Sequence, residues 1–109
     1  MADYLESLSK PTVSAVDLAL VRGALDDNDL DWAEVFVEDM GIIRIISAVE
    51  SKKDDPSIWE INKVALECFE TIMDKPPLKD DPKKSGLHLI IGQKAALEFI
   101  INQVFHFPF

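Results

Sequence analysis

The chain has 109 residues, of which 48% are apolar and 28% are charged, and its formal net charge is −9. This length and apolar fraction are typical of a single folded domain with a core and argue against a disordered chain. The excess of acidic residues argues against unaided binding to nucleic acid or to an anionic membrane, because phosphate contacts need clustered Lys and Arg.

The cysteine content and the start of the chain point to an intracellular protein. Cys68 is the single cysteine, so no disulfide can form within the chain. The first residues show no basic segment followed by an apolar run, and no apolar stretch approaches the roughly 20 residues that span a bilayer. We therefore expect a soluble cytoplasmic protein without a membrane span. Its acidity suits a basic protein surface or a basic peptide as partner.

Turn and capping residues predict helices along the whole chain. There are 4 glycines, no Asn-Gly or Asp-Gly turn and no sustained alternation of polar and apolar residues, which argues against a sheet. Residues 14–17, Ser-Ala-Val-Asp, resemble a capping box and open an amphipathic run that reaches Leu25. Residues 26–29, Asp-Asp-Asn-Asp, form a polar turn whose acids also suit the start of the next helix.

Two helices are expected on either side of Gly41. Trp32, Phe36 and Val37 lie at i, i+4 and i+5, on one side of the first helix. At this spacing core packing is favoured over an exposed peptide-binding patch, because large aromatic side chains normally face inward. We expect Gly41 to end this helix in the left-handed conformation and the next helix to occupy 42–51.

The longest predicted helix begins beside a proline. Asp55-Pro56 places a capping residue before a proline at the first helical position, and apolar residues then recur at three-four spacing over 57–74. Cys68 falls on the apolar side of this helix, as a small core residue. Residues 76–84, which include three prolines, form a loop.

A short helix around 86–91 and a last helix over 93–105 complete the chain. Large apolar side chains crowd this end: Phe99, Ile100, Ile101, Val104, Phe105, Phe107 and Phe109. Either the chain is a portion of a longer helical stack, which we favour, or these side chains fold back over the last helix as a cap. In both cases an apolar end predicts self-association into a homo-oligomer.

The segment around Gly41 recurs imperfectly around Gly86. Residues 39–47, Asp-Met-Gly-Ile-Ile-Arg-Ile-Ile-Ser, resemble residues 84–92, Lys-Ser-Gly-Leu-His-Leu-Ile-Ile-Gly, and the two glycines are 45 positions apart (86 − 41). Helical repeats of the armadillo and HEAT type have a period of about 40–47 residues. The sequence therefore predicts an all-α fold, an armadillo/HEAT-like right-handed helical repeat stack of about two repeats. Such stacks bind other proteins along a groove.

No residue pattern supports an enzyme or a bound metal. Residues 27–38 place acids at positions one, three, five and twelve of a calcium loop, but position six holds Trp32 where that loop needs glycine. A capped helix start explains the same acids. His88 and His106 have no Cys or carboxylate at ligand spacing, and no serine or cysteine lies beside a plausible base. We therefore expect no catalytic residue, no metal and no cofactor.

Five segments, taken in order, are similar to the GTPase-binding and formin homology 3 region of diaphanous-related formins, which regulate actin assembly. They are Asp-Tyr-Leu at 3–5, the leucine-rich run 18–25, Trp-Ala-Glu-Val-Phe at 32–36 followed by Gly41 and Ile45-Ile46, the stretch 65–73 and the glycine-led run 85–91. The resemblance implies one armadillo-like regulatory domain over 1–109. It would comprise an N-terminal helical segment at 1–28, a first repeat at 29–74 and the start of a second repeat at 85–109.

In that family the N-terminal region binds an activated Rho-type GTPase and the formin's own C-terminal autoregulatory segment, and GTPase binding releases that segment. The resemblance implies that the GTPase contacts a turn formed by Asp26, Asp27, Asn28 and Asp29. Asn28 matches the family's asparagine-rich turn, and two positions have gained charge. The resemblance also implies a groove for the autoregulatory segment near the end of the long helix, with residues Glu67, Glu70, Met73, Asp74 and Lys75.

Two alternatives stay open. The acids of the long helix are either the rim of an apolar groove for a basic amphipathic helix or a solvated face without a partner; they are Glu60, Glu67, Glu70 and Asp74. The chain itself is either the front part of a formin regulatory region, associated with the cytoskeleton, or an armadillo-like scaffold fragment that self-associates and has no link to actin.

Overall fold

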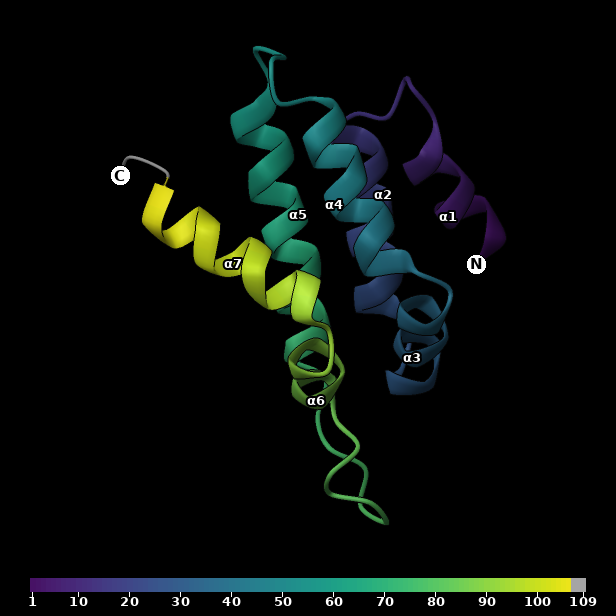
Figure 1. The fold of residues 1–109 in the computed structure, drawn as a ribbon. Helices are drawn as coiled ribbons and strands as arrows, with labels where there is room; N and C mark the ends of the chain where they lie inside the picture. Colours follow the sequence, from purple (N-terminus) through teal and green to yellow (C-terminus); the bar gives the residue numbers. More distant parts are fainter. Residues whose placement is uncertain (107–109) are drawn as a thin grey trace.

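The computed structural model describes residues 1–106, and of residues 104–106 the backbone alone. Over this range every regular element is a helix (Figure 1): α1 spans Ala2–Ser9, α2 Ala15–Asp27, α3 Leu30–Glu38, α4 Gly41–Ser51, α5 Ile58–Met73, α6 Gly86–Ile91 and α7 Lys94–His106. The predicted all-α fold is confirmed for this part of the chain. None of these helices combines the length and the apolar character needed to cross a bilayer.

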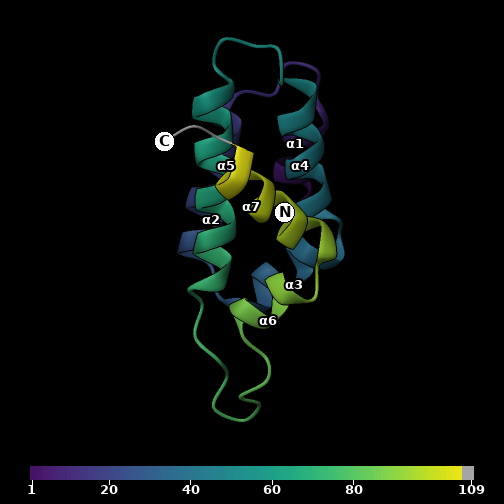
Figure 2. The same ribbon diagram turned by 60° about the vertical axis from the view of Figure 1, so that its left-hand side comes forward.

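Each of the first four helices packs against the helix three places later in the chain. α1 packs on α4, α4 on α7, α2 on α5, and α3 on α6. Figure 2 shows α2 and α5 on one side, α1 and α4 on the other, and α3 and α6 together at one end. The molecule measures 45 × 32 × 19 Å. Its shortest dimension corresponds to two layers of helices, since packed helix axes are about 8–10 Å apart.

One hydrophobic core runs between the layers. Its largest fully buried side chains come from α2 to α6: Leu18, Leu25, Phe36, Ile42, Ile45, Ile61, Phe69, Ile72 and Ile90. α7 joins this core through Phe99, whose ring meets Phe69 edge-on with the ring centroids 5.6 Å apart. Cys68 is fully buried, as its place on the apolar side of the long helix predicts. The apolar periodicity of the sequence therefore identified the buried face of α5 correctly.

Two predicted helix starts are confirmed by their caps. The backbone N–H of Ser14 donates to Asp17 Oδ2 at 2.9 Å, which completes the capping box at the start of α2. The backbone N–H of Trp32 donates to Asp29 Oδ1 at 3.1 Å, so Asp29 caps α3. One acid of this turn is thus a helix cap, in agreement with the interpretation of residues 27–38 as a capped helix start.

The predicted role of Gly41 as a left-handed helix end is wrong. Met40 takes the left-handed conformation, with φ of 69°, and Gly41 is the first residue of α4. A Cβ on Gly41 would lie 2.4 Å from the ring of Phe36. Glycine is therefore needed here for the close approach of α4 to a buried aromatic ring. The left-handed conformation falls instead on Met40, whose side chain is exposed and therefore meets no crowding.

Pro56 is not the first residue of the long helix, which begins at Ile58. The carboxylate of Asp55 accepts hydrogen bonds from the backbone N–H and the hydroxyl of Ser57, at 2.8 and 2.6 Å. This turn delays the helix by two residues. At the N-terminus, α1 lies within the helical segment expected at 1–28 and includes the Asp-Tyr-Leu stretch at 3–5, and its Leu5 and Leu8 join the core.

Gly41 and Gly86 both open helices, but the helices occupy different places in the packing. α4 lies between α1 and α7, whereas α6 packs against α3 and α5. A Cβ on Gly86 would lie 1.6 Å from the carbonyl oxygen of Ile72, so this glycine also permits a close helix contact. The recurrent sequence therefore reflects a glycine needed at the start of each helix for a close approach. It does not correspond to equivalent positions in the packing of the helices.

The apolar end of the chain falls largely outside the described residues. Phe107 and Phe109 are not described, and neither are the side chains of Val104 and Phe105. The predicted self-association through this end therefore stays a prediction.

Candidate protein-binding surfaces

The turn between α2 and α3, residues 26–29, is exposed at all four positions. Asn28 donates from Nδ2 to the carbonyl oxygen of Ala24 at 2.7 Å, which satisfies the end of α2, and Asp29 caps α3. Among the described residues, the side chains of Asp26 and Asp27 have no hydrogen bond or ion pair. The turn thus holds two structural residues and two carboxylates that are available to a partner.

The structure brings Lys75 to this turn. Lys75 Nζ donates to the backbone oxygen of Asn28 at 2.6 Å, because α2 and α5 run side by side and end close together. A cavity of about 350 Å³ lies between the turn and residues 75–79. A second cavity of about 560 Å³, which includes Asp27 and Trp32 in its lining, lies on the other side of the turn. Lys75, which was predicted to line the groove for the autoregulatory segment, therefore lies at the α2–α3 turn.

Trp32 borders that second cavity and also packs inward. Its ring stacks on Phe36 with centroids 6.1 Å apart and meets Tyr4 edge-on at 6.0 Å. Phe36 is fully buried and Trp32 is half-buried. The predicted core packing of this aromatic pair is confirmed.

A groove of about 640 Å³ lies between α5 and α7, and we call it the α5–α7 groove. Its described lining residues are Trp59, Glu60, Asn62, Lys63, Leu66, Glu67, Glu70 and Gln103. Of the five residues predicted for a tail groove, Glu67 and Glu70 line it. Met73, Asp74 and Lys75 do not, because they lie at the far end of α5, near the α2–α3 turn. Figure 1 shows α7 crossing in front of the lower part of α5 and running away from that end toward the C-terminus.

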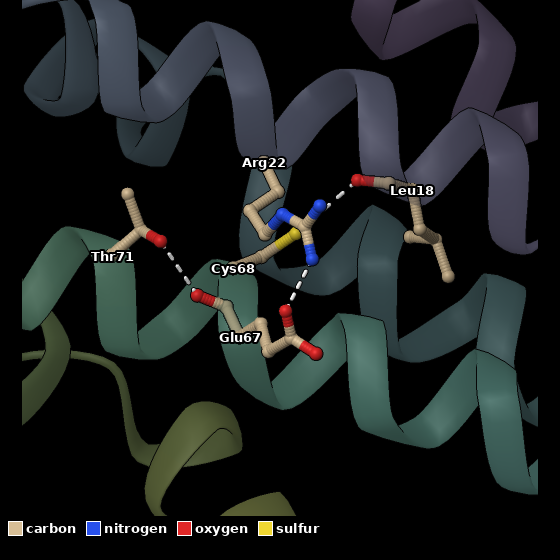
Figure 3. A network of polar contacts seen from close by, with 5 residues as sticks. All are labelled: Leu18, Arg22, Glu67, Cys68 and Thr71. Atoms are coloured by element: carbon tan, nitrogen blue, oxygen red, sulfur yellow. Dashed lines mark hydrogen bonds and ion pairs between the residues drawn. The ribbon is translucent and has the colours of Figure 1, made fainter.

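An ion pair across the α2–α5 contact changes the charge of this groove. Arg22 Nη1 pairs with Glu67 Oε2, and both side chains are about one-third exposed. Figure 3 shows Arg22 reaching from α2 to Glu67, beside Cys68 and Leu18. Because Glu67 is already neutralised by Arg22, Glu60 and Glu70 are the acids that remain for a partner. Both side chains are exposed.

Cys68, next to this ion pair, is not a reactive group. Its Sγ donates to the carbonyl oxygen of Leu18 at 3.5 Å. Burial raises the pKa of the Cys68 thiol to about 12, while the nearby Arg22 lowers it and Glu67 raises it. Because a thiol reacts as its thiolate, the raised pKa and the full burial make Cys68 a poor nucleophile.

Asn62 is the groove residue that the sequence analysis missed. It is 5% exposed, and its Oδ1 has no hydrogen-bond partner in the part of the chain that the structure describes. Asn62 also lines a neighbouring cavity of about 350 Å³ together with Gln103 and Asn102. Its position between Ile61 and Val64 of the apolar pattern was the available signal, because a polar residue on a buried face needs a partner.

Ser85 and His88 form a helix cap. Ser85 Oγ accepts a hydrogen bond from the backbone N–H of His88 at 3.3 Å and lies 2.7 Å from Nδ1 of the same residue. Ser85 is buried at the start of α6. Among the described side chains, no group of three or more His, Cys, Asp or Glu could hold a metal ion.

Comparison with models of known protein families, with curated proteins and with solved structures found no match for this chain.

Proposed function

We propose that this chain is a protein-binding regulatory module with an armadillo-like stack of helices, similar to the N-terminal part of a formin. The contact of each helix with the third one along supports this proposal, because repeats of three helices stack in that way. α3, α4 and α5 would form the first repeat, over 29–74, and α6 and α7 would begin the second, over 85–109. The module would work in the cytoplasm, in association with the actin cytoskeleton.

The single observation that carries a binding function is the α5–α7 groove with its free acids. The apolar side chain of Leu66 lies among Glu60, Lys63 and Glu70 in the groove wall. An amphipathic helix with basic residues would bury its apolar face there and place its charges near the acids. In the formin interpretation this occupant is the formin's own C-terminal autoregulatory segment.

The second surface of the proposed module is the α2–α3 turn. The free carboxylates of Asp26 and Asp27 would accept hydrogen bonds from the switch region of an activated Rho-type GTPase. Exposed charges of this kind contribute to the association rate and to selectivity more than to affinity. GTPase binding at the turn would release the autoregulatory segment and so control actin assembly.

Titration of the purified chain with Rho-family GTPases, each loaded with a GTP analogue or with GDP, tests this function. We expect binding in the GTP-analogue state that is at least about tenfold tighter than in the GDP state, as differential recognition requires. The double variant Asp26→Ala/Asp27→Ala should weaken it without changing the helical circular dichroism. Asp54→Ala/Asp80→Ala removes two exposed acids elsewhere and is the matched control. Equal or absent binding in the two nucleotide states would reject the regulatory function.

A scaffold that self-associates and has no link to actin is the second candidate. It is favoured by exposed apolar side chains on α6 and α7, namely Leu87, Ile91, Leu97 and Ile101. Such side chains on neighbouring helices favour contact with another protein surface. Sedimentation velocity should then show a dimer or larger species that Ile91→Glu/Ile101→Glu converts to monomer. A monomer at all concentrations would reject this candidate.

A further inference from the structure

The wall of the α5–α7 groove contains a buried hydrogen-bond acceptor to which no described residue donates. Asn62 is 5% exposed, and no described residue donates to its Oδ1. A buried oxygen of this kind costs folding free energy unless another group supplies the hydrogen bond. The donor can come from a bound ligand, since Asn62 lines an open groove.

Asn62 lies where two cavities meet. The α5–α7 groove and the neighbouring cavity between α4, α5 and α7 share Asn62 and Gln103 in their linings. The two cavities therefore adjoin one another at these two amides. A ligand lying along α5 would pass over Asn62 at this junction.

The charge of the groove selects a cationic donor. Glu60 and Glu70 are exposed and have no ion pair among the described residues, whereas Arg22 neutralises Glu67. Lys63 opposes them with one positive charge. The remaining balance is negative, so a cation enters more favourably than a neutral group.

We propose that the α5–α7 groove binds a basic peptide segment and that an arginine of this segment donates a hydrogen bond to Asn62 Oδ1. This inference rests on the proposed peptide-binding function of the groove and names a contact that would give the groove selectivity for an arginine-containing peptide. Arginine suits the position because its side chain is long, ends in five N–H donors and is more weakly hydrated than an ammonium group. Its remaining donors stay in the field of Glu60 and Glu70.

Three designed peptides test the contact on the full chain of 109 residues. The first is an amphipathic 12-residue peptide of Leu, Ala and Arg, acetylated and amidated at its ends. Its twins carry citrulline, which keeps the shape without the charge, or norleucine, which has no donors, in place of arginine. Calorimetric titration gives the affinity, and ¹H–¹⁵N spectra follow the side-chain amide of Asn62.

The substitution Asn62→Leu removes the acceptor and keeps the size of the side chain. We expect it to weaken binding of the arginine peptide about tenfold to a hundredfold, the range for a hydrogen bond to a charged group, and to leave the norleucine peptide unaffected. Asn62→Leu should also melt at an equal or higher temperature than the native chain, because a buried unpaired oxygen is gone. Asn28→Leu makes the same change at an exposed position of the α2–α3 turn, outside both cavities, and should bind the arginine peptide like the native chain.

Equal binding of the arginine peptide by Asn62→Leu and the native chain would overturn the inference and leave the groove proposal intact. Failure of all three peptides would overturn both, whereas the GTPase titration decides the turn surface separately. If a bound water is the only partner of Oδ1, the arginine peptide will leave the Asn62 amide resonance unmoved, which would also overturn it. If Asn62→Leu does not fold, Asn62→Asp keeps the acceptor and adds charge, so it must bind the arginine peptide more tightly.

Discussion

Two glycines that lie in helices have opposite surroundings. Gly23 lies inside α2, and a Cβ added to it would meet no atom within 4 Å. Gly86 opens α6, and a Cβ there would overlap the carbonyl oxygen of Ile72, at 1.6 Å. We expect Gly23→Ala to raise the free energy of unfolding by about 1 kcal/mol, because alanine is the better helix former. Gly86→Ala should lower it by about 2 kcal/mol or more, because α6 must move away from α5.

Urea unfolding of the two variants, followed by circular dichroism, measures both changes. Each variant is the control for the other, since the chemical substitution is the same. A Gly86→Ala protein as stable as the native chain would show that α6 does not approach α5 as closely as described.

The buried thiol of Cys68 makes the free energy of unfolding depend on pH above about pH 9. Burial raises the pKa of Cys68 from 9.0 to about 12, so the folded chain keeps a proton that the unfolded chain loses above about pH 9. The free energy of unfolding should therefore fall between about pH 9 and pH 12, by at most about 1.4 kcal/mol per pH unit. Below pH 9 this contribution is fully present.

Comparison with Cys68→Ala isolates the contribution, because other groups also titrate at high pH. The variant will be less stable at neutral pH, since a buried side chain is truncated, but its stability should decline less steeply above pH 9. Parallel pH dependences of the two proteins would contradict the buried thiol. Alkylation of native Cys68 should also be slow until the chain unfolds.

Single residues were predictable where one face of one helix decides their surroundings. Phe36 and Cys68 were predicted to be buried from their spacing in the sequence, and both are. Asn62 was not identified, because its unpaired oxygen depends on which side chains α7 brings near it. The ion pair of Arg22 with Glu67 was not predicted for the same reason, since it joins helices that are far apart in the chain.

At the level of elements, the start of α3 depends on Asp29. Replacing it with alanine removes the hydrogen bond to the backbone N–H of Trp32 and should cost about 1 kcal/mol in the free energy of unfolding. Asp26→Ala, in the same turn, should change stability by less than about 0.5 kcal/mol, because its side chain is exposed. Thermal unfolding distinguishes the two. Equal effects would mean that the cap at Asp29 is not formed in solution.

The sequence predicted that the helices exist, but it predicted where they begin only where the capping residues lie close to the helix start in the chain. The capping box of Ser14 and Asp17 and the cap at Asp29 lie within four residues, so their sequence patterns sufficed. Gly41 was misread because its reason is the ring of Phe36 in the preceding helix. Pro56 was misread because the turn at Asp55 and Ser57 competes with the first turn of the helix.

For the whole molecule, the net charge of −9 sets the response to salt. Raising the ionic strength from about 0.01 M to 0.15 M shortens the screening length from about 30 Å to 8 Å. Self-repulsion of the folded chain should weaken, so we expect the urea midpoint to rise over this range. A falling midpoint would mean that ion pairs such as Arg22–Glu67 and Lys84–Glu34 outweigh the repulsion.

The α2–α3 turn and the acids of α5 could be predicted as candidate surfaces, but their grouping could not. Lys75 was predicted to lie with Glu67 and Glu70, yet it contacts Asn28 at the α2–α3 turn. The groove beside Glu67 and Glu70 is completed by Gln103 of α7, which lies more than 30 positions later in the chain. Residues close together in sequence at the end of a long helix can therefore line different surfaces.

The sequence by itself determined that this chain is helical, where most of its helices lie and which of their faces are buried. These properties depend on contacts within one or two turns, which periodicity and capping residues encode. The tertiary structure alone decided which helices meet, why glycine is needed at positions 41 and 86, and that Asn62 Oδ1, where two cavities join, has no donor among the described residues. Those properties depend on contacts between different helices, and a one-dimensional pattern does not record how the helices pack.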